Sequence, residues 1–156
     1  MANPASLFVT DPSIVEHCQR VNRLAATLMV AQPALSKKIC RALLCGPDEA
    51  NIALVETIKF MWLAAETDDG PLTPAHRVDL AWHELILFTR AYQQLCQEQF
   101  GKFVHHQPAG HDEEHHKPLA KTLVHYKKMF GAAPDDFWGT YWTAGATCGT
   151  CESNGE

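Results

Sequence analysis

Proline and glycine divide this chain into segments in which apolar residues recur every three or four positions. That spacing places the apolar side chains on one face of a helix. No segment alternates apolar and polar residues for long enough to predict a strand. Several segments also open with proline, which suits the first turn of a helix because its missing N–H is not needed there. The sequence therefore predicts an all-α protein of about six helices, over residues 12–31, 34–44, 49–66, 73–100, 118–130 and 134–142.

The fourth of these helices is long for a small domain, and Thr89 can cap a second helix after a bend. Residues 102–117 are polar and rich in histidine, which predicts a loop. Hydrophobic residues make up 46% of the chain and charged residues 20%, a composition typical of globular proteins. We expect a single domain over residues 1–142, followed by a flexible tail, 143–156, that contains two cysteines.

Charge and hydropathy exclude some classes of protein. The net charge is −5 and the lysines and arginines are scattered, which argues against nucleic-acid binding. The first residues lack the basic and apolar regions of a signal peptide, and no run of about 18 apolar residues predicts a membrane span. We therefore expect a cytoplasmic protein, in which the six cysteines are thiols, ligands or redox groups rather than structural disulfides.

A carboxylate and an imidazole lie one helical turn apart at Asp79 and His83, in a segment that is otherwise mostly apolar. If this helix is buried on most sides, both groups are costly to desolvate unless they are paired. Three explanations stay open. Asp79 can be structural, bonded to His83 or to Arg90. Both residues can serve a metal, as two ligands or as a ligand and its supporting partner. His83 can instead be a general base, with Cys96 as a nucleophile brought near by the bend.

Five of the nine histidines fall between residues 105 and 116, beside three acidic residues. Three of them are more typical of a solvated loop: His111, His115 and His116. The pair His105-His106 differs, because it follows the apolar Phe103-Val104 and precedes Pro108. We expect an extended backbone there that turns one imidazole inward, as the third partner of the helical carboxylate–imidazole pair.

The spacing of Cys148 and Cys151 is that of a metal knuckle or a redox pair. A structural zinc site would need a second pair of ligands at similar spacing, and the chain has none. An unliganded tail, a tail disulfide, and ligands shared with the histidine loop therefore stay open. Cys96 lies on an apolar helix face and is expected to be buried.

The run from Val78-Asp79 through Trp82-His83 to His105-His106 resembles the core signature of the glycine-rich domain-containing protein-like family. The resemblance covers about residues 69–142, and the tail with its Cys-x-x-Cys is similar to short bacterial members. It implies a mostly helical fold and no defined activity. Several members carry a second histidine two residues after the Trp-His pair, where this chain has Leu85.

From the residues, we predict that the protein binds one transition metal, zinc or iron, through Asp79, His83 and either His105 or His106. Arg90 or Cys96 is expected near the site. Three ligands with an open position would permit water activation, so hydrolytic or oxidative chemistry is a further hypothesis.

The rival hypothesis is a non-catalytic interaction module. In it, the helical carboxylate and imidazole are structural, and an aromatic segment near the C-terminus docks a protein partner. The aromatic residues of that segment are Phe137, Trp138, Tyr141 and Trp142. A redox role for the two tail cysteines is a third hypothesis.

Overall fold

Seven α-helices and no strand are found in the part of the chain that the computed structural model describes, residues 11–107 and 116–139. They are α1 (Pro12–Ala31), α2 (Pro33–Leu43), α3 (Pro47–Glu66), α4 (His76–Leu87), α5 (Thr89–Phe100), α6 (His116–Phe130) and α7 (Asp135–Trp138). The predicted all-α class is confirmed. The cysteine tail, most of the histidine loop, Tyr141 and Trp142 lie outside the described residues.

Local sequence explains where the first three helices begin. Each has a proline in its first turn, at Pro12, Pro33 and Pro47. The Asp11 side chain also caps α1, because its carboxylate accepts a hydrogen bond from the Ser13 N–H at 2.9 Å. These boundaries follow from chemistry within a few residues, which is why the sequence predicted them closely.

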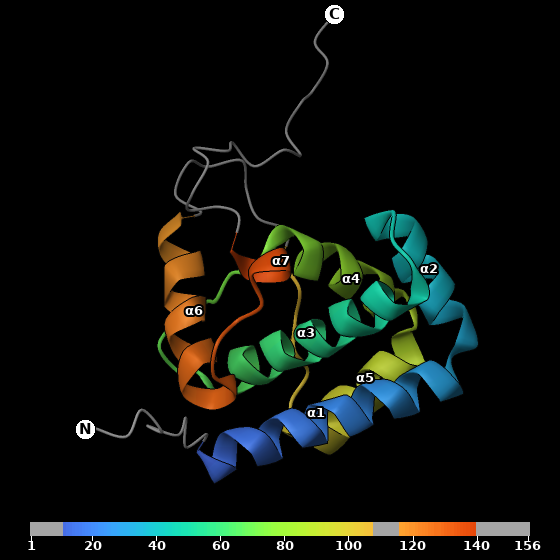
Figure 1. Cartoon of the computed structure of the whole chain (residues 1–156). Coiled ribbons are helices and arrows are strands. Elements are labelled where there is room, and N and C mark those ends of the chain that lie inside the picture. The colour runs from blue at the N-terminus through green and yellow to red at the C-terminus, as the bar shows by residue number, and fades with distance from the viewer. Residues whose placement is uncertain (1–10, 108–115, 140–156) are drawn as a thin grey trace, which may run out of the picture.

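Helix α3 forms the centre of the fold. Twelve of its residues are buried, and it contacts α1, α2, α4, α5 and α6. Figure 1 shows α3 passing between α1 and α5 on one side and α4 and α7 on the other, with α6 at one end. A helix surrounded in this way must be apolar around most of its circumference. None of the helices within residues 11–107 and 116–139 is long and apolar enough to cross a membrane.

One charged residue of α3 lies in the core. Glu56 is 2% exposed, and its carboxylate accepts hydrogen bonds from the Lys59 ammonium at 2.9 Å, the Tyr126 hydroxyl at 2.7 Å and the Trp138 indole at 2.8 Å. We call these four residues the Glu56 cluster. These three hydrogen bonds compensate the buried charge of Glu56. Those from Tyr126 and Trp138 also join α3 to α6 and α7. Phe137 and Trp138 are thereby core residues, only 6% and 1% exposed.

The long predicted helix is divided at Phe88, whose φ of −83° and ψ of 62° leave the helical region. The expected bend before a second helix at Thr89 is confirmed. The expected start at Thr73 was wrong, since α4 begins at His76. The Thr73 N–H donates to the Thr122 hydroxyl at 3.0 Å, and that hydroxyl donates to the Thr73 carbonyl at 2.8 Å. Contacts with α6 therefore hold Thr73 outside the helix.

Candidate metal centre

Asp79 and His83 face the same side of α4 because they are one turn apart. The Asp79 Oδ2 and His83 Nε2 atoms are 3.9 Å apart, and the two side chains are 31% and 47% exposed. The expectation of a helix buried on most sides was wrong. Helix α4 buries one face and leaves the flank with Asp79 and His83 open to solvent, and Leu87, one turn after His83, is 69% exposed.

His106 completes the cluster from the loop that follows α5. Its Nε2 atom lies 2.7 Å from Asp79 Oδ1, and its side chain is only 9% exposed. The imidazole also packs against its neighbours, with ring centroids 4.5 Å from Trp82 and 4.3 Å from His83. A residue 27 positions after Asp79 is thus held directly against its carboxylate.

The three side chains can offer one ligand atom each, and these atoms all lie within 4.8 Å of one another. We call Asp79, His83 and His106 the Asp/His triad. Bonds of about 2.0–2.2 Å from a zinc ion would bring such ligand atoms to roughly 3–4 Å separation. The Asp79–His106 distance of 2.7 Å is shorter than this range and the distance of 3.9 Å between Asp79 and His83 falls within it, so side-chain rotation would be needed to admit an ion. Within the described residues this is the one group of three or more such ligands.

The two histidines of the loop face different ways. Val104 is buried, His105 is exposed and His106 is largely covered, which is the alternation of an extended backbone. The His105 ring packs against Phe103 with centroids 4.8 Å apart. His105, which we named as one of two alternatives, therefore lies outside the triad.

Two buried aromatic residues support the loop, and sequence reasoning missed their polar role. The Tyr92 hydroxyl donates to the Val104 carbonyl at 2.5 Å, and the Trp82 indole N–H donates to the Tyr92 oxygen at 3.0 Å. Burial raises the pKa of Tyr92, so the phenol keeps its proton for the loop. In the sequence both residues fit the apolar face of a helix, and no local signal shows where their polar atoms point.

The other residues that we expected near the centre occupy different surroundings. Cys96 is buried, its thiol meets the Val104 backbone, and burial raises its pKa, which does not favour a nucleophilic thiolate. Arg90 is exposed on α5 and borders a shallow groove with Gln93 and Gln97. The ion pairs of Asp79 within the described residues are with His83 and His106. Cys148 and Cys151 lie outside the described residues.

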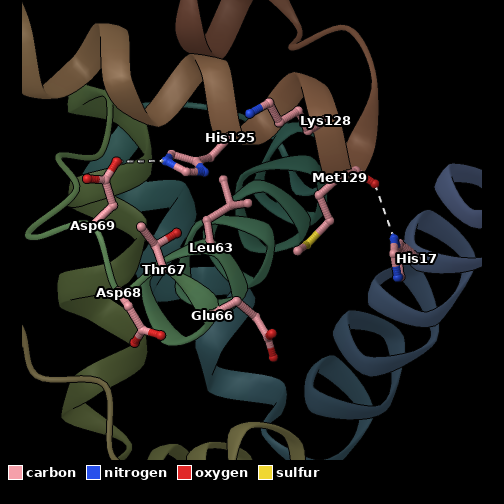
Figure 2. A pocket seen from close by; sticks show the side chains of 9 residues that line it. All are labelled: His17, Leu63, Glu66, Thr67, Asp68, Asp69, His125, Lys128 and Met129. Carbon is pink, nitrogen blue, oxygen red and sulfur yellow. Dashed lines mark hydrogen bonds and ion pairs between the residues drawn. The ribbon is translucent and has the colours of Figure 1, made fainter.

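A separate groove of about 650 Å³ lies between α1, the end of α3 and α6. Figure 2 shows two histidines at its margins, turned to different partners. His125 Nε2 is 3.6 Å from Asp69 Oδ2, while His17 Nδ1 is 3.3 Å from the Met129 carbonyl oxygen. Because these imidazoles do not converge, the groove lacks the ligand geometry of the Asp/His triad.

The chain is thus a small all-α protein in which one carboxylate and two imidazoles converge between α4 and the loop after α5. The UCP032817-like family model matches residues 14–124, and the chain belongs to this family. The matched range contains all three residues of the triad. No curated protein and no solved structure matches the chain.

The resemblance to the glycine-rich domain-containing protein-like family was wrong. The matched family is the UCP032817-like family, and nothing indicates the glycine-rich one. The resemblance rested on short motifs within residues 69–142, whereas the match begins at residue 14 and takes in the first three helices. A few shared residues around a Trp-His pair were therefore insufficient to assign the family.

Proposed function

We propose that this protein binds one transition metal ion, zinc or iron, through Asp79, His83 and His106. The observation that carries the proposal is the convergence of three ligand atoms within 4.8 Å, from a helix and from a loop well separated in sequence. Two imidazole nitrogens and one carboxylate oxygen suit zinc and ferrous iron, whereas magnesium and calcium prefer oxygen ligands.

An ion pair alone does not explain this arrangement as well. Asp79 and His106 satisfy each other at 2.7 Å, so one imidazole is enough to pair the carboxylate. The second imidazole, His83, stays 3.9 Å from the same carboxylate, too far for a hydrogen bond. A cation would give the His83 imidazole a partner as well, because the three ligand atoms converge within 4.8 Å, and the His106–Asp79 hydrogen bond would open to admit the ion.

The chemistry of the proposed centre follows from its charge and exposure. A divalent ion with one carboxylate ligand keeps a net charge of +1, which favours hydroxide or another anion in the remaining positions. Three protein ligands leave at least one such position in a tetrahedral ion. The 47% exposure of His83 gives solvent access to this side of the cluster. Hydrolytic or oxidative chemistry is a further part of the proposal.

Metal analysis of purified protein tests the proposal. The protein is stripped with chelator, loaded with Zn²⁺ or, without oxygen, with Fe²⁺, and dialysed before elemental analysis. We expect about one equivalent of metal in the wild type. His83→Ala and His106→Ala should retain much less after dialysis, because the loss of a ligand lowers the affinity at least 10-fold. The matched control is His105→Ala, which removes the neighbouring imidazole outside the triad and should leave metal content unchanged.

Two results would contradict a site at the triad: metal content far below one equivalent, or metal that is lost only when the loop histidines are replaced. The histidines meant here are His111, His115 and His116, of which the last is the first residue of α6. The non-catalytic interaction module would then be the better hypothesis. A protein partner stays a prediction, and the burial of Phe137 and Trp138 leaves these two side chains inside the core instead of on a docking surface.

A further inference from the structure

A hydrogen-bonded chain links the core to the loop that carries His106. Tyr92 and Trp82 are 1% and 4% exposed. The Trp82 N–H donates to the Tyr92 oxygen, and the Tyr92 O–H donates to the Val104 carbonyl oxygen. A phenol has a single proton to donate, so the bond to Trp82 leaves that proton for the loop. The orientation of the hydroxyl is therefore fixed from both sides.

This chain of bonds determines where His106 points. Val104 precedes His106 by two residues, and in an extended backbone residues two apart face the same side. Holding the Val104 carbonyl thus sets the direction of the His106 side chain. Trp82 acts a second time, because its ring meets the His106 ring at 4.5 Å with an interplanar angle of 66°. Backbone and imidazole are both supported by the same pair of aromatic residues.

We propose that Tyr92 and Trp82 are positioning residues for the Asp/His triad, a role that rests on the proposed metal binding. By fixing His106 against Asp79 before a metal arrives, they reduce the side-chain freedom lost on binding and so raise affinity. The helical half of the triad needs no such support, because Asp79 and His83 are placed by α4 itself. The loop half depends on the tyrosine hydroxyl.

Packing alone does not require that hydroxyl. The Tyr92 ring already packs edge-on against Phe103, with centroids 5.2 Å apart, and phenylalanine would keep this contact. The protein also contains a matched comparison in Tyr126, another fully buried tyrosine. Its hydroxyl donates to Glu56 at 2.7 Å, in the Glu56 cluster and not in the loop. The Tyr126 oxygen also accepts from the Lys59 ammonium at 2.9 Å, as the Tyr92 oxygen does from Trp82. Tyr92→Phe and Tyr126→Phe therefore make the same chemical change, each removing a hydroxyl that donates one hydrogen bond and accepts another.

The first measurement is the affinity for Zn²⁺ in competition with a chromophoric chelator, with folding of each variant verified by circular dichroism. We expect the dissociation constant to rise 10- to 100-fold in Tyr92→Phe and to stay within about 2-fold of wild type in Tyr126→Phe. Trp82→Phe keeps a ring beside His106 but loses the donor, so we expect a rise of up to about 10-fold. The visible spectrum of bound Co²⁺ should differ from that of the wild type in Tyr92→Phe and match it in Tyr126→Phe.

The second measurement uses the metal-free protein, so that it does not depend on metal binding. Diethyl pyrocarbonate modifies accessible imidazoles, and tandem mass spectrometry distinguishes His106 from His105. We expect slow modification of His106 in the wild type and in Tyr126→Phe, and a several-fold faster reaction in Tyr92→Phe. The exposed His105 is the internal reference and should react at the same rate in all three proteins.

The outcomes separate the two proposals. If Tyr92→Phe binds zinc like the wild type and leaves His106 protected, the positioning role is overturned while the metal site stands. If the wild type takes up neither zinc nor ferrous iron but Tyr92→Phe exposes His106, metal binding is refuted and the positioning role is supported. Equal loss of affinity in Tyr92→Phe and Tyr126→Phe would also overturn the proposal, because general destabilisation would then explain both.

Discussion

Two carboxylates of this protein are held in opposite ways. Glu56 is 2% exposed, and its oxygens accept hydrogen bonds from an ammonium, a phenol and an indole. Asp79 is 31% exposed, and its neighbours are the imidazoles of His83 and His106. Ammonium and indole groups can only donate, whereas a neutral imidazole also presents a lone pair.

The difference shows what makes a carboxylate available for chemistry. The partners of Glu56 are committed to it, and displacing them would leave buried polar atoms without hydrogen bonds. The partners of Asp79 are able to turn a lone pair toward a cation at little cost, because the cluster borders solvent. We therefore interpret the Glu56 cluster as a joint between helices and the Asp/His triad as the place of binding.

The largest effect on stability is expected from Glu56→Gln. The new amide group would direct N–H donors at the Lys59 ammonium, which is only 12% exposed, and the buried ion pair would be lost. We expect the free energy of unfolding in urea to fall by about 3 kcal/mol. Metal content should be unchanged in the folded variant. A loss below about 1 kcal/mol would contradict the structural role of this cluster.

Metal binding itself should stabilise the protein by a comparable amount. Zn²⁺ at 100 times its dissociation constant is expected to raise the free energy of unfolding by about 2.7 kcal/mol. The same zinc concentration should have little effect on His106→Ala, and its full effect on His105→Ala. Equal stabilisation of all three proteins would show that zinc binds elsewhere.

Alkaline pH should weaken the Glu56 cluster. Burial raises the pKa of Tyr126 well above the ordinary 10.0 of a tyrosine, and the neighbouring Glu56 carboxylate raises it further. Above pH 10 the unfolded chain therefore releases a proton that the folded protein keeps, so stability is complete below pH 10 and falls above it. The expected loss from this group is about 1.4 kcal/mol at pH 11.

Urea unfolding between pH 8 and pH 11 measures this dependence. In Tyr126→Phe the phenol is absent, so the fall in stability above pH 10 should be smaller than in the wild type. Parallel curves for the two proteins would contradict the raised pKa of Tyr126.

The smallest effect on stability is expected from Asp79→Asn, the counterpart of Glu56→Gln. Asp79 is partly exposed, and an amide oxygen is still able to accept a hydrogen bond from His106. The free energy of unfolding of the metal-free protein should change by less than about 1 kcal/mol, while zinc affinity falls at least 10-fold. A large loss of stability without metal would make Asp79 structural, like Glu56.

Much of the fold was predictable from local signals. Proline was expected to open the first helix and to separate the next ones, and the structure places Pro12, Pro33 and Pro47 in the first turns of three helices. The break at Phe88 was anticipated from Thr89. The start of α4 was placed too early, because the backbone of Thr73 bonds to Thr122, 49 residues away. Such a long-range contact leaves no mark in the sequence around Thr73.

The candidate site was predictable in part. Asp79 and His83 were visible as a pair because helical geometry relates residues four apart. The choice between His105 and His106 was not, since it depends on how the loop is attached to Tyr92. The exposure of the flank of α4 was also missed, because apolar residues around a helix do not show which of them the remaining helices cover.

The sequence by itself determined the helices, their main interruptions and the spacing of the carboxylate and imidazole on α4, because these depend on residues within one or two turns. Only the tertiary structure decided that His106 joins them, that Tyr92 and Trp82 support it, and that Glu56 is enclosed. These features depend on side chains that meet across long stretches of chain, up to 82 residues for Glu56 and Trp138. Their contacts exist only once the helices have packed around α3.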